Sequence, residues 1–202
     1  MEPDMTAPAL DRRTGGAAVA GGLLLVASVG AELVHPVQNP DGSVVSPVLF
    51  AGYLGAWALG AAALLVAQLG LRRTPGLPAV GRAGAVVNLV GTGLLLAFGL
   101  VLVASALATG APLEASFLAF GLGLLLVAVG SVLLGLGLRR SGAVGNWWTA
   151  LPVASAGALV ALLVEQWHDA GMFVFFAGWV LLGVRCMQRS RRPADRVAAP
   201  VG

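Results

Sequence analysis

The sequence has no lysine, one cysteine and very little charge, and each scarcity excludes a class of protein. Charged residues make up 10% of the 202 residues, whereas a soluble domain carries about 25%. Hydrophobic residues make up 58% of the chain and the mean hydropathy is +0.90, so intrinsic disorder is excluded too. Cys186 has no cysteine partner for an internal disulfide, and no zinc-finger or Cys-x-x-Cys spacing occurs. These properties are typical of an integral membrane protein.

Six predominantly apolar runs are long enough to cross the hydrocarbon core of a bilayer, which takes about 20 apolar residues. They cover residues 17–34, 48–71, 83–108, 115–138, 147–164 and 171–187. Short connections rich in Pro, Gly and Asp separate them. The sequence therefore predicts an all-α bundle of six transmembrane helices over residues 17–187. The flanking segments 1–16 and 188–202, which are rich in Pro, Ala and charge, are predicted to be disordered tails.

Arginine placement predicts the orientation, because short cytoplasmic loops retain positive charge. With six spans, all twelve arginines fall on one side of the membrane: Arg12, Arg13, Arg72, Arg73, Arg82, Arg139, Arg140, Arg185, Arg189, Arg191, Arg192 and Arg196. We therefore expect both termini to be cytoplasmic, in a plasma (inner) membrane. The arginines are juxtamembrane and lack interleaved aromatic residues, so a nucleic-acid partner is not expected. An alternative is that residues 12–31 form a cleaved signal peptide, which would leave five spans.

Small and polar residues within the runs suggest how the helices associate. Gly123, Gly130 and Gly137 recur every seven residues, which predicts a stripe that lets a neighbouring helix approach closely. Gln68 and Asn88 are expected at similar depth, where a hydrogen bond between their side chains would join two helices, although a substrate-lining role is the alternative. The bilayer is the expected partner, and a second membrane protein or another copy of the chain is possible through these faces.

A cluster of acids and histidines is predicted at the outer face. Each histidine follows a glutamate by three residues, in Glu32-x-x-His35 and Glu165-x-x-His168, a spacing that places both side chains on one helix face. Two Glu-x-x-His pairs on separate helices are typical of carboxylate-bridged metal sites, and Glu114 would supply a third carboxylate. The two histidines would alternatively hold a haem. The simplest interpretation is that these are solvated interface residues and that no cofactor is bound.

Three functions follow as hypotheses. The first is a non-enzymatic structural or accessory membrane component, because the interiors of the spans lack ionisable residues and the sequence has no phosphate-binding loop and no nucleophile paired with a histidine. The second is a small-solute transporter or channel, and the third is a redox protein that uses the outer metal or haem site. Tyr53, Trp57 and Trp179 are expected to be packing groups. The composition resembles that of short multi-span proteins from GC-rich bacteria, which identifies no site.

Overall fold

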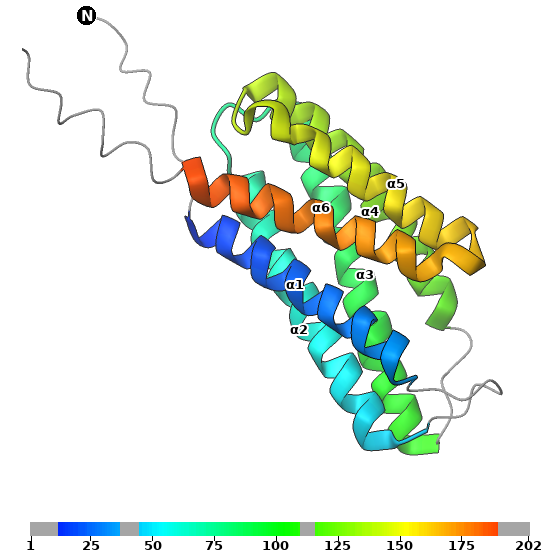
Figure 1. The fold of residues 1–202 in the computed structure, drawn as a ribbon. Helices are drawn as coiled ribbons and strands as arrows, with labels where there is room; N and C mark the ends of the chain where they lie inside the picture. Colours follow the sequence, from blue (N-terminus) through cyan, green and yellow to red (C-terminus); the bar gives the residue numbers. More distant parts are fainter. Residues whose placement is uncertain (1–11, 37–44, 110–115, 190–202) are drawn as a thin grey trace, which may run out of the picture.

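The computed structural model describes residues 12–36, 45–109 and 116–189, and in these ranges the chain is helical without a strand (Figure 1). The long helices are α1 (Arg12–Val34), α2 (Pro47–Arg72), α3 (Ala79–Thr109), α4 (Ser116–Ser141), α5 (Ala150–Leu163) and α6 (His168–Arg189). Two short 3₁₀ turns, η1 (Gly145–Thr149) and η2 (Glu165–Trp167), precede α5 and α6. Six helical segments of this part of the chain are long and apolar enough to cross a membrane. The predicted class is therefore confirmed.

Local sequence determines where α2 begins and ends. The hydroxyl of Ser46 accepts a hydrogen bond from the backbone N–H of Leu49 at 3.5 Å, and Pro47 occupies the first helical position, where no N–H is needed. Beyond the C-terminal end, Gly76 adopts a φ of +73°, which favours glycine and lets the chain reverse into α3.

Three spans differ in their limits from the runs read off the sequence. Helix α1 already begins at Arg12, inside the segment 1–16 that was predicted to be a disordered tail, and the last two spans differ as well. The run 147–164 begins as the 3₁₀ turn η1, and the α-helix starts only at Ala150. The run 171–187 is preceded by one more turn of helix, because α6 already begins at His168. His168 therefore opens the sixth helix instead of closing the fifth, and η2 interrupts the helix between Glu165 and His168.

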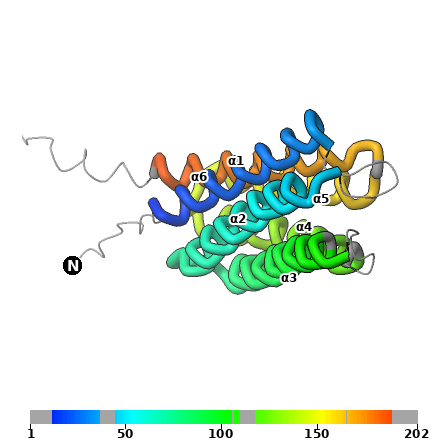
Figure 2. Tube along the Cα trace, turned by 90° about the horizontal axis from the view of Figure 1, so that it is seen from below, coloured from blue at the N-terminus to red at the C-terminus, as the bar shows by residue number. Residues whose placement is uncertain are grey.

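The six helices form a closed ring. Each packs against its neighbours in the sequence, and α6 returns to pack against α1, while the backbones of the other pairs of these six described helices stay farther apart. Figure 2 shows the start of α1 beside the end of α6, with α3 and α4 on the opposite side of the bundle. Neighbouring helices run antiparallel, so that the starts of α1, α3 and α5 share one end with the ends of α2, α4 and α6.

Glycine brings α3 and α4 into close contact. A Cβ atom built on Gly130 would lie 2.6 Å from the backbone nitrogen of Asn88 and 2.9 Å from the carbonyl oxygen of Gly84. One built on Gly123 would lie 2.8 Å from the Leu95 side chain, and Gly137 meets the backbone of α3 in the same way. All three glycines of the stripe thus face α3, where only a residue without a side chain leaves room for this approach.

Apolar residues occupy both the interior and the outside of the ring. Trp179, Phe175 and Leu124 are fully buried, whereas large side chains such as Leu59 and Leu118 are 66% and 81% exposed. Helices that are apolar on every face are stable in hydrocarbon but would expose a large, aggregation-prone apolar surface in water. The outer surface therefore has the composition of a lipid-facing surface.

Candidate functional site

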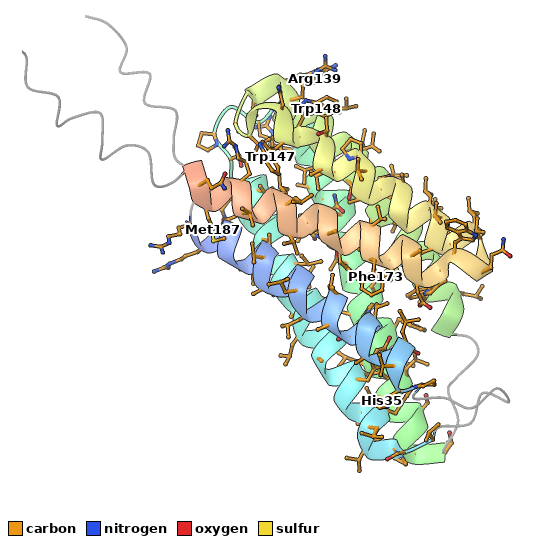
Figure 3. The ribbon with its side chains drawn as sticks, in the orientation of Figure 1. His35, Arg139, Trp147, Trp148, Phe173 and Met187 are labelled. Carbon is orange, nitrogen blue, oxygen red and sulfur yellow. The ribbon has the colours of Figure 1, made fainter. Side chains whose placement is uncertain are left out.

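The charged side chains separate to the two ends of the ring. Close contacts between α1 and α6, between α1 and α2 and between α3 and α4 bring together the helix ends that carry arginine. We call this the arginine end; its described arginines are Arg12, Arg13, Arg72, Arg73, Arg82, Arg139, Arg140, Arg185 and Arg189. The opposite end carries both histidines, and we call it the histidine end. Figure 3 shows His35 and Arg139 at opposite extremes of the bundle.

A cavity of about 580 Å³ opens inside the ring at the histidine end, and residues from all six helices line it. Its wall is mainly apolar and aromatic, with four residues whose polar side chains are titratable. The lining residues are Val29, Glu32, Phe50, Tyr53, Leu54, Trp57, Phe98, Leu102, Phe120, Gly121, Ala161, Leu162, Leu163, His168, Asp169 and Met172. Ligand pockets typically measure about 300–1,000 Å³ and combine an apolar wall with a few polar groups.

Three of the polar groups act on one another. Tyr53 on α2 and Glu32 on α1 line the same wall, and the carboxyl groups of Glu32 and of Asp169 on α6 act electrostatically on the Tyr53 hydroxyl. All three residues are partly buried. Residues from three helices therefore contribute polar groups to one cavity wall.

The fourth polar group, His168, also stabilises the end of α5. Its Nδ1 lies 2.8 Å from the carbonyl oxygen of Ala161, which lies in the last turn of α5, where helix carbonyl groups lack a helical N–H partner. Since a carbonyl can only accept, Nδ1 carries the proton in this bond. The ring also lies 5.9 Å from that of Phe120, measured between centroids. Both contacts fix His168 in the cavity wall.

His35 lies elsewhere. It is exposed, one residue beyond α1, and lines a separate groove of about 410 Å³ between α1 and α2. The groove is mostly apolar, and Glu32 and Tyr53 line it as well as the cavity. These two side chains thus form the partition between groove and cavity, and the two histidines share neither space.

The structure describes the side chains of three of the five proposed metal ligands, Glu32, His35 and His168. Within the described ranges, no group of three or more His, Cys, Asp or Glu side chains is arranged to hold a metal ion. Glu114 and the side chain of Glu165 lie outside what the structure describes. Of the five proposed ligands, the cavity brings together Glu32 and His168, and His35 lies in the groove. Metal and haem binding stay predictions.

The expected bond between Gln68 and Asn88 is replaced by two others. Gln68 Nε2 donates to the Thr92 hydroxyl at 2.8 Å, and the Ser131 hydroxyl donates to Asn88 Oδ1 at 3.3 Å. Side chains tilt toward the start of their own helix. Gln68 on α2 therefore reaches away from the arginine end, whereas Asn88 on α3 tilts toward it, so Gln68 meets the residue one turn farther along α3. All four residues are buried and link α2, α3 and α4.

Sequence reasoning missed most of the cavity wall. It assigned Tyr53 and Trp57 to packing, but both line the cavity, in a stripe of α2 that begins at Phe50. The spacing of three, then four residues was visible as one aromatic helix face. The contributions of Phe98 and Phe120 carried no such signal, because α3 and α4 are apolar on every side. Their rings lie 4.9 Å apart between centroids.

Comparison with known proteins gives no relative. No protein-family model, curated protein or solved structure matches the chain.

Proposed function

We propose that this chain is a multi-pass membrane protein that binds a small solute in the cavity at its histidine end, as a transporter or a solute-binding component does. The observation that carries the proposal is that residues of all six helices line one cavity of about 580 Å³. A bundle with a purely structural role would gain stability by filling this space, since protein interiors are close-packed.

The packed interior at the arginine end supports the same proposal, because it contrasts with the cavity at the histidine end. Toward the arginine end the interior is filled by large, fully buried side chains such as Leu71, Leu138 and Leu182. Glycines there bring backbones into contact, as between Gly15 and Gly183. The cavity thus lies at the end where the polar groups gather, away from this packing.

The proposal includes an orientation. With the arginine end in the cytoplasm, as the positive-inside rule favours, both chain termini are cytoplasmic and the cavity lies toward the outer face of a plasma membrane. The accessory-component hypothesis shares this topology but predicts no solute affinity. A measurement of solute binding therefore distinguishes the two hypotheses.

Three single-ring probes test the proposal: benzyltrimethylammonium, its uncharged carbon isostere neopentylbenzene, and phenylmethanesulfonate. Binding to protein in zwitterionic nanodiscs is measured by equilibrium dialysis, with empty nanodiscs as the blank. We expect saturable binding of at least one probe, abolished when Leu102→Trp or Met172→Trp fills the cavity.

Leu100→Trp is the matched control. Leu100 is 55% exposed on the same helix as Leu102, which is 6% exposed and lines the cavity. The control variant should bind as the wild type does. Absence of saturable binding for all three probes, or binding that survives both cavity-filling variants, contradicts the proposal.

A further inference from the structure

We propose that the cavity selects organic cations with an apolar or aromatic body over neutral and anionic molecules of the same shape. This inference rests on the proposed function and adds the chemical class of the ligand. Its evidence is the chemistry of the lining residues.

The charge of the cavity wall has one sign. Glu32 and Asp169 line it, and no arginine or lysine is among its described lining residues, so its formal charge is −2 with His168 neutral. The described arginines lie at the other end of the ring. A carboxylate in an apolar surrounding is costly unless a positive partner compensates its lost hydration. A cationic ligand supplies that partner, whereas an anion adds repulsion.

The remaining wall is suited to the same charge. Five aromatic residues line the cavity: Phe50, Tyr53, Trp57, Phe98 and Phe120. The face of an aromatic ring attracts a cation within about 6 Å of its centroid, most strongly for tryptophan. Trp57 is 6% exposed and packs beside Gly99, where an added Cβ would lie 3.1 Å from the indole ring. Because Gly99 on α3 has no side chain, the indole ring packs closely against this helix and is not covered there by a side chain.

The polar and aromatic groups lie around a single space, which sets the expected form of the ligand. Glu32 and Tyr53 line the cavity from α1 and α2, and Asp169 lines it from α6. A compact quaternary ammonium group with one ring attached satisfies both components: the charge meets the carboxyl groups and the aromatic faces, and the ring replaces apolar contacts. It also needs no hydrogen-bond acceptor from the wall.

The three probes named above test the inference on the wild-type protein alone. Benzyltrimethylammonium and neopentylbenzene have the same shape and differ in charge, so the ratio of their dissociation constants isolates the effect of the charge. We expect the cation to bind about tenfold more tightly or better, the combined effect of one ion pair and the aromatic faces, and phenylmethanesulfonate not to bind. Equal binding of cation and isostere overturns the inference while the proposed function stands; no binding of any probe overturns both.

Variants assign the selectivity to residues. Glu32→Gln and Asp169→Asn should each reduce affinity for the cation by about three- to tenfold relative to affinity for neopentylbenzene. Trp57→Leu should also reduce the affinity for the cation relative to that for neopentylbenzene. Asp11→Asn removes the acid that directly precedes Arg12 in the sequence, and should change the binding of neither probe. Selectivity that persists in the Glu32→Gln, Asp169→Asn double variant contradicts the assignment.

Discussion

His168, the first residue of α6, donates from Nδ1 to the carbonyl oxygen of Ala161 on α5 at 2.8 Å. The bond spans the tight connection between the two helices and satisfies a carbonyl that the end of α5 leaves free. Because His168 also lines the cavity, the same side chain contributes to the fold and to the proposed binding site.

Removing this bond should destabilise the protein. His168→Ala leaves the 4%-exposed Ala161 with an unsatisfied carbonyl, which costs about 1–3 kcal/mol. Thermal unfolding in detergent measures the effect. His35→Ala is the control, because His35 is exposed and lines only the groove. Equal unfolding temperatures for the two variants would show that the bond contributes nothing.

The glycine contact between α3 and α4 should tolerate no side chain. Gly130→Ala places a Cβ 2.6 Å from the backbone nitrogen of Asn88, and overpacking of this kind costs about 1–3 kcal/mol. Gly93→Ala on α3 is the matched control, since a Cβ there has nothing within 4 Å. Denaturant titration should show loss of stability only for Gly130→Ala. A normal Gly130→Ala protein would mean that the helices lie farther apart.

The side chains of Gln68 and Thr92 should be energetically coupled. A double-mutant cycle of Gln68→Leu with Thr92→Val is expected to give a coupling energy of about 0.6–1.7 kcal/mol, the range for hydrogen bonds between membrane helices. The cycle of Gln68→Leu with Asn88→Ala should give less, because these two side chains are not bonded to each other. A larger coupling energy for Gln68 with Asn88 than for Gln68 with Thr92 would instead support the direct hydrogen bond that the sequence predicts.

Orientation can be measured by labelling single cysteines in intact cells. In a Cys186→Ala background, Gln166→Cys at the histidine end should react with a membrane-impermeant maleimide. Asn146→Cys at the arginine end should react only after permeabilisation. Both residues are exposed and uncharged, so the substitutions preserve the arginine bias. Labelling of Asn146→Cys in intact cells would reverse the proposed orientation.

The number and class of the helices were readable from the sequence, because hydrocarbon thickness fixes the length of each apolar run. The ring and its cavity were not. Helices that are apolar on every face, such as α4, carry no periodicity that marks the inward side. The Glu165-x-x-His168 spacing predicted one helix face, but η2 interrupts the helix there. Tyr53 and Glu32, 21 positions apart in the sequence, meet only because α1 and α2 pack side by side.

The most direct test of the account is to locate a bound probe. Protein crystals are prepared with an iodinated form of whichever single-ring probe binds most tightly, and the iodine is placed by anomalous diffraction. The account predicts an iodine peak inside the ring, between Phe98 on α3 and Met172 on α6. A peak found only in the groove beside His35 or on the lipid-facing surface, or no peak at saturating probe, would contradict it.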